Sequence, residues 1–204
     1  MRNLWAIFRK ELASYFISPV AYVVIILFFL LMSFFFCYFL IVYTNTYDQY
    51  QASLNLYFQM SSQNPFLAQQ MAQPEPPNFN EEVVRPFYFW LSFMMLFILP
   101  MLTMRLFAEE KRSGTIELML TYPVRDVEVV LGKFLACLAV FSILLLLTVV
   151  FPLYINLETD GTKLEVGPLA LTYLGAFLVG GSFISLGILL SSLTRNQIVA
   201  GILT

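Results

Sequence analysis

The chain contains no histidine, only two cysteines and few charged residues. Without histidine it lacks the commonest metal ligand and the side chain that most often carries protons near neutral pH. Cys37 and Cys137 both fall inside long apolar runs, so we interpret them as small buried or lipid-facing side chains and expect no disulfide. Charged residues make up only 12% of the 204 residues, about half the usual share, which argues against an ordinary soluble domain.

Apolar residues dominate the composition instead. Hydrophobic residues account for 59% of the chain and the mean hydropathy is +0.78. Aromatic residues reach 17%, as expected for lipid-facing surface with aromatic belts at the membrane boundaries. The net charge of -2 says little about partners. We therefore predict an integral membrane protein of the all-α class, a polytopic helical bundle.

Four apolar runs are long enough to cross a hydrocarbon core of about 30 Å as helices. The expected spans are residues 20–43, 87–104, 131–156 and 168–190. A fifth run, residues 197–204, is too short to cross, so the chain is expected to stop within a fifth span. In the fourth span, small residues at four-residue spacing predict close helix packing. These pairs are Ala176 with Gly180 and Gly181 with Ser185.

Two further segments lie outside the spans. Residues 2–16 place apolar side chains on one helical arc and basic ones away from it, which predicts a helix lying in the membrane interface. A simple basic flank of the first span is the alternative, and a removable signal peptide fits poorly. Residues 44–86 are rich in Gln, Asn and Pro and predict an external loop, with a short helix possible at 48–60. This loop carries no catalytic or metal-binding pattern.

A charged segment from Arg105 to Lys133 separates the second and third spans and holds ten charged residues. At the centre of a membrane helix each would cost at least about 2.5 kcal/mol, so the segment must lie in water beside the membrane. Gly114 interrupts it and Pro123 stops it, which predicts a short amphipathic helix between them. Its apolar face would comprise Ile116, Met119 and Leu120. An ordinary solvated loop is the alternative.

The same segment resembles the signature of ABC-2 type permeases. Residues 109–124, EEKRSGTIELMLTYPV, and residues 130–133, VLGK, carry the resemblance. It extends to RKEL at 9–12, to SPVAY at 18–22 and to the order of the spans. Within the superfamily the chain is most similar to the gliding-motility-associated permease subunit. The resemblance implies a six-span domain in which residues 105–130 form a cytoplasmic coupling segment that docks on a separate ATPase subunit.

The resemblance also implies the partners and the contact residues. Polar docking is expected from Glu109, Glu110, Lys111 and Arg112, and apolar contact from Ile116, Met119 and Leu120. Gly114, Thr115, Glu117 and Pro123 complete the expected coupling site. No cofactor is expected in this chain, because ATP and Mg²⁺ would be bound by the partner ATPase. Other expected partners are a second permease copy in a homodimer or heterodimer, membrane lipid and a periplasmic auxiliary subunit.

The distribution of basic residues predicts the orientation. Nine of the eleven Lys and Arg residues fall on one side if the amino terminus and the charged segment share it. They are Arg2, Arg9, Lys10, Arg105, Lys111, Arg112, Arg125, Lys133 and Arg195. Only Arg85 and Lys163 lie opposite. By the positive-inside rule the first side is cytoplasmic, and we expect a multi-pass protein of the bacterial inner membrane with a cytoplasmic amino terminus.

The sequence lacks the motifs of an ATPase. Gly132 and Lys133 are followed by Phe134, and position 127 is Val, so no phosphate-binding P-loop is formed. No nucleophile with a paired base, no cluster of His and Cys and no nucleic-acid groove is recognisable. We therefore predict a non-enzymatic permease subunit that couples ATP hydrolysis by a partner to export of an unidentified substrate. The alternatives are a non-transporting membrane anchor and an ion-driven secondary transporter, although no ionisable residue lies at the middle of an expected span.

Overall fold

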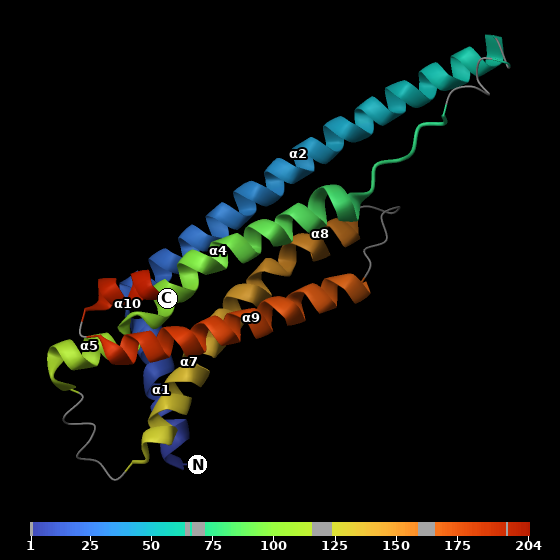
Figure 1. The fold of residues 1–204 in the computed structure, drawn as a ribbon. Helices are drawn as coiled ribbons and strands as arrows, with labels where there is room; N and C mark the ends of the chain where they lie inside the picture. Colours follow the sequence, from blue (N-terminus) through green and yellow to red (C-terminus); the bar gives the residue numbers. More distant parts are fainter. Residues whose placement is uncertain (1, 64–65, 67–71, 116–123, 159–165, 195) are drawn as a thin grey trace.

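The computed structural model describes residues 2–63, 66, 72–115, 124–158, 166–194 and 196–204 (Figure 1), and these contain helices but no strand. The helices are α1 Arg2–Ile17, α2 Pro19–Gln63, the π-helical turn η1 Asn80–Val84, α4 Arg85–Thr103, α5 Arg105–Ser113, α7 Asp126–Thr148, α8 Val150–Glu158, α9 Val166–Leu193 and α10 Gln197–Leu203. The predicted all-α class is thereby confirmed.

Four helical segments of the described chain are long and apolar enough to cross a membrane. They are Ala21–Gln63, Asn80–Ser113, Asp126–Tyr154 and Val166–Leu193, and each contains one of the four predicted spans or nearly all of it. Their shared core comprises Met32, Leu91, Leu99, Leu144 and Ile184, all fully buried. The start of α4, the end of α8 and the start of α9 lie at one end of the bundle, whereas α1 and α5 lie at the other (Figure 1).

The first apolar helix is much longer than the predicted span. The composition predicted a loop from residue 44, but α2 continues unbroken to Gln63. Residues 44–63 contain neither proline nor glycine, so nothing in the chain ends the helix there. At 1.5 Å per residue α2 is about 67 Å long, roughly twice the hydrocarbon thickness. The expected loop of residues 44–86 is therefore wrong at both ends, since η1 and the start of α4 occupy residues 80–86.

Glycines in α9 allow close packing against α4 and α7. A Cβ atom added at Gly180 would overlap the Phe141 ring of α7, and one at Gly187 would overlap Thr103 of α4. The close contact predicted at Gly180 is thus present. Gly181 makes only ordinary contact with Leu138 on α7, and Ser185 is exposed, so the second predicted pair does not bring helices together.

Gly180→Val is expected to lower the free energy of unfolding by roughly 1–3 kcal/mol, the usual cost of overpacking a tight interface. The matched control is Gly175→Val on the same helix, because a Cβ there meets no atom within 4 Å. Thermal unfolding of both variants in detergent measures the difference. Equal midpoints would contradict the packing described for α7 and α9.

Candidate functional site

Helix α5 carries the first half of the predicted coupling site. Its Leu106, Phe107 and Ala108 are buried against the bundle, while Glu109, Arg112 and Ser113 are exposed. The helix ends at Gly114, whose φ of 74° is the left-handed conformation that glycine adopts without strain. Gly114 therefore fixes the direction in which the chain leaves α5.

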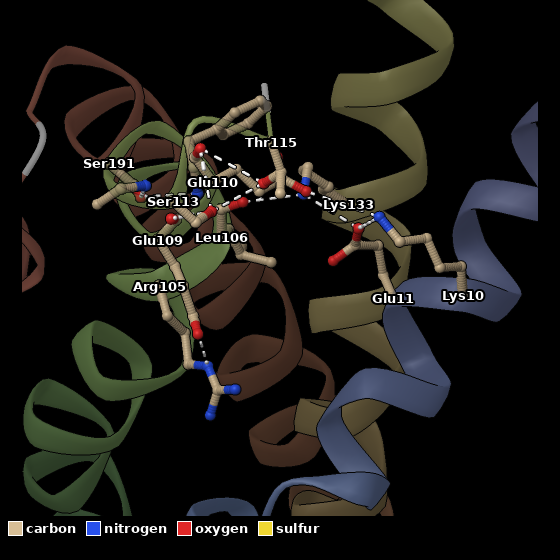
Figure 2. A network of polar contacts seen from close by, with 12 residues as sticks. Lys10, Glu11, Arg105, Leu106, Glu109, Glu110, Ser113, Thr115, Lys133 and Ser191 are labelled. Atoms are coloured by element: carbon tan, nitrogen blue, oxygen red, sulfur yellow. Dashed lines mark hydrogen bonds and ion pairs between the residues drawn. The ribbon is translucent and has the colours of Figure 1, made fainter. Parts of the chain in front are cut away.

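A buried lysine joins three helices at this site (Figure 2). The Lys133 ammonium of α7 is 2.8 Å from Glu110 Oε1 of α5 and 3.1 Å from Glu11 Oε1 of α1. It also donates to the Leu106 carbonyl at 2.9 Å and lies 5.0 Å from the centre of the Phe107 ring. With its side chain only 1% exposed, Lys133 has its charge compensated entirely by these neighbours. We call Glu11, Glu110 and Lys133 the triad.

A small polar cavity adjoins the triad between α1 and α5. It has a volume of about 280 Å³, and Lys10, Glu11, Arg105, Glu109 and Glu110 are among its lining residues. Lys10 reaches over it from an exposed position, 3.5 Å from Glu11 Oε1 and 3.8 Å from Glu110 Oε1. The second carboxylate oxygen of Glu110 is buried without a hydrogen bond. The triad therefore lies at the boundary between the protein interior and water.

Helix α9 holds the start of α5 in place. The Ser191 hydroxyl accepts hydrogen bonds from the backbone N–H groups of Phe107 and Ala108 at 3.1 and 3.2 Å, and donates to the Met104 carbonyl at 3.0 Å. Met104 itself provides no side-chain cap, so a serine from another helix satisfies amides that the first turn leaves unpaired. Lys111 also donates to the Ser192 carbonyl.

Helix α1 packs against α7 and α4. A Cβ added at Gly132 would lie 2.7 Å from the Ile7 side chain, so glycine is needed for α1 to approach α7 this closely. The Tyr15 hydroxyl donates to the Leu102 carbonyl of α4 at 2.7 Å. Burial raises the pKa of Tyr15 well above its ordinary value, so the phenol stays a neutral donor.

Tyr15→Phe is expected to destabilise the protein by about 1 kcal/mol, because it leaves the buried Leu102 carbonyl without this partner. Tyr22→Phe is the matched control, since Tyr22 is half exposed and donates no hydrogen bond to a described residue. Denaturation midpoints in one detergent give the comparison. A loss in the control as large as that in Tyr15→Phe would refute the role of this bond.

The described residues contain only part of the predicted coupling site. Glu109, Glu110, Lys111, Arg112, Gly114 and Thr115 are described, whereas Ile116, Glu117, Met119, Leu120 and Pro123 lie outside the described residues. Glu109 forms an ion pair with Arg105, which lies four residues earlier on α5, at 3.3 Å. Arg112 and Thr115 are exposed.

Sequence reasoning missed the triad. Lys133 was assigned both to the aqueous segment and to the edge of the third span, and its burial in α7 corrects the first assignment. Glu11 and Lys133 are 122 residues apart, so no local spacing reveals the pair. The one available signal was the charge of Lys133 inside the predicted span 131–156, which is costly unless a partner compensates it.

The match to known proteins covers nearly the whole chain: residues 5–204 match the family described as ABC-2 family transporter protein. The chain belongs to the ABC-2 transporter family. No curated protein and no solved structure matches it. Members of the family are transmembrane components rather than ATPases, and membership implies an ABC ATPase partner. With its four apolar helical segments, the ABC-2 protein is a multi-pass membrane protein.

The triad of this ABC-2 permease holds three helices together. Among the described residues no group of three His, Cys, Asp or Glu side chains is arranged to hold a metal ion. The acidic side chains of the triad are instead occupied by a lysine. What the arrangement provides is a rigid connection between α1, α5 and α7 at one end of the permease.

Proposed function

We propose that this permease transmits the work of ATP hydrolysis, performed by a separate ATPase subunit, to the export of a substrate across the bacterial inner membrane. ATP and Mg²⁺ bind to that partner. The amino terminus and the coupling segment, residues 105–130, lie in the cytoplasm. The observation that carries the proposal is the triad, because Lys133 connects the helices that precede and follow the segment expected to contact the ATPase.

The coupling segment leads into a membrane span at each of its ends. Only the turn at Met104 separates α5 from α4, and α7 begins at Asp126 and runs through the third span. A force applied to the chain between α5 and α7 is therefore transmitted to the second and third spans together. It also reaches α1 through the ion pair of Lys133 with Glu11. Breaking a buried ion pair by displacing one partner costs several kcal/mol, so the three helices move as a unit.

The intramolecular contacts narrow the surface offered to the ATPase. Glu110 is paired in the triad and Lys111 donates to the backbone of α9, so both serve mainly to anchor α5. Arg112 and Thr115 are exposed beyond them. We propose that these two residues, together with residues 116–120, make the direct contact, and that Gly114 sets their direction.

The remaining partners follow from the same proposal. A second permease copy, identical or related, completes the transmembrane pathway, and a periplasmic auxiliary subunit serves the side opposite α5. The specific resemblance to gliding-motility-associated permeases remains a prediction. A membrane anchor without transport is the competing function, and it differs in leaving ATP hydrolysis unaffected by changes in the coupling segment.

Cysteine cross-linking tests the proposed contact. In a Cys37→Ser background, Thr115→Cys is expected to cross-link to the ATPase subunit, and to react with an impermeant maleimide only from the cytoplasmic side. The native Cys137 is fully buried and should not interfere. Leu178→Cys on α9, exposed on the apolar surface, is the matched control and should give no ATPase adduct. Labelling of Thr115→Cys from outside the cell would overturn the proposal.

A further inference from the structure

Two neighbouring cavities lie between α4 and α9 at the end of the bundle opposite α5. The first, of about 300 Å³, is bounded by η1 and the first turns of both helices, and includes Asn80 and Arg85. The second, of about 310 Å³, continues between the helices towards Phe183. Tyr88 and Thr172 line both, so the two cavities are contiguous.

The two cavities differ in chemistry. The inner one is a slot lined mainly by apolar side chains, among them Leu91, Met95, Ala176 and Phe183. The outer cavity carries the charge. Among the described residues that line the two cavities, Arg85 is the charged one, and its side chain is exposed. Glu81 and Glu82 precede it in the chain but line neither cavity. A ligand matching both parts has an anionic end and an apolar tail.

Tyr88 supplies an independent sign of a ligand. Its side chain is buried, with 7% of the residue exposed, and its hydroxyl oxygen makes no hydrogen bond of ordinary geometry with a described residue. The Tyr173 ring packs edge-on against the Tyr88 ring at 5.3 Å, and the Tyr173 hydroxyl, itself 3.1 Å from Thr148 Oγ1, is the polar group next to the Tyr88 hydroxyl. Buried hydroxyls are normally paired, and this one lies where the two cavities join.

The position of α9 adds to the positive potential of the outer cavity. Pro168 and Leu169 of the first turn of α9 line it, and the amino-terminal end of a helix carries a partial positive charge. Phosphate oxygens accept hydrogen bonds from guanidinium, amide and phenol groups, which Arg85, Asn80 and Tyr88 provide.

We propose that these cavities form a binding site for an anionic phospholipid. Its phosphate lies against Arg85 and accepts a hydrogen bond from the Tyr88 hydroxyl, and an acyl chain occupies the slot between α4 and α9. The surrounding bilayer supplies such a molecule directly, since the slot runs along the apolar length of two membrane-spanning segments. The site lies away from the coupling segment and requires no nucleotide.

Photo-cross-linking tests the site in the assembled permease–ATPase complex. A phosphatidylglycerol with a photoreactive acyl chain, incorporated in nanodiscs, is expected to label peptides covering residues 80–96 and 168–183. Arg85→Gln should reduce this labelling about tenfold or more, as expected for loss of a hydrogen bond to a charged group. Tyr88→Phe, which keeps the ring contact with Tyr173, should reduce it less.

A second variant tests the slot separately. Gly175 lines it and has open space where a side chain would project, so Gly175→Leu should fill the slot and block labelling without clashing. Leu178→Phe on an exposed part of α9 that lines neither cavity is the control. Unchanged labelling in both Arg85→Gln and Gly175→Leu, or labels confined to other helices, would overturn the proposal. Competition by inorganic phosphate as effective as that by phosphatidylglycerol would show a phosphate site instead of a lipid site.

Discussion

Lys133→Met is expected to destabilise the permease by about 3–5 kcal/mol, because it leaves two carboxylates close together without the buried cation that compensates them. Methionine retains most of the length and apolar volume of the side chain, so little of the loss comes from a cavity. The repulsion between the carboxylates of Glu11 and Glu110 is then expected to draw water into the interface, which loosens α1 and α5 from α7.

Compensating substitutions separate the contribution of charge to the lost stability from the contribution of packing. Glu11→Gln and Glu110→Gln combined with Lys133→Met remove all three charges, and this triple variant should recover much of the stability lost in Lys133→Met. Lys10→Met is the matched single control. Lys10 is 67% exposed and pairs with the same carboxylates only at 3.5 and 3.8 Å, so its loss should cost no more than about 1 kcal/mol.

Two measurements on the purified complex compare these variants with the unmodified permease. Thermal unfolding in detergent reports the stability, and ATP hydrolysis with and without the permease reports the coupling. We expect Lys133→Met to lower the midpoint and to weaken the effect of the permease on the ATPase. A triple variant that regains stability but not coupling would show that the charges themselves contribute to transmission. Stability in Lys133→Met equal to that in Lys10→Met would contradict the buried triad.

The spans were predictable because each depends on a property of a continuous stretch of sequence. A run of some twenty apolar residues must leave water, and a backbone in hydrocarbon must satisfy its hydrogen bonds within the helix. The length of α2 was not predicted, since the polar residues after Tyr43 resembled a loop in composition. Residues 44–63 lack helix-breaking residues, however, and this absence of proline and glycine was the better guide.

The candidate site was less predictable because its contacts are long-range. The resemblance pointed to residues 109–123, but the partner of Glu110 lies 23 residues further on in α7, and Tyr15 bonds to a carbonyl 87 residues away. Gly132 was noted only as part of a GK pair, and its role in letting α1 approach α7 depends on Ile7. Such pairings arise when helices pack, and no periodicity within one helix encodes them.

Gly114→Val is expected to reduce coupling by roughly 5- to 150-fold while leaving the membrane bundle intact. A φ of 74° is strained for a β-branched residue by about 1–3 kcal/mol, and coupling free energies between sites are of the same size. A side chain at Gly114 would meet no atom within 4 Å, so the effect must come from the backbone rather than from a clash. Valine is expected to turn the following residues away from the ATPase.

Gly114→Asn is the matched control, because asparagine tolerates the left-handed conformation far better than valine does. If Gly114 acts by directing the chain out of α5, then Asn should preserve most of the coupling, Ala should give an intermediate value and Val should lose it. Coupling is measured as the change in ATP hydrolysis when the permease is added, at equal expression and equal midpoint of unfolding. Equal coupling in the Asn and Val variants would mean that the conformation at residue 114 does not govern contact with the ATPase. In that case transmission would have to depend on the anchored part of α5 alone, where Glu110 and Lys111 are already engaged within the permease.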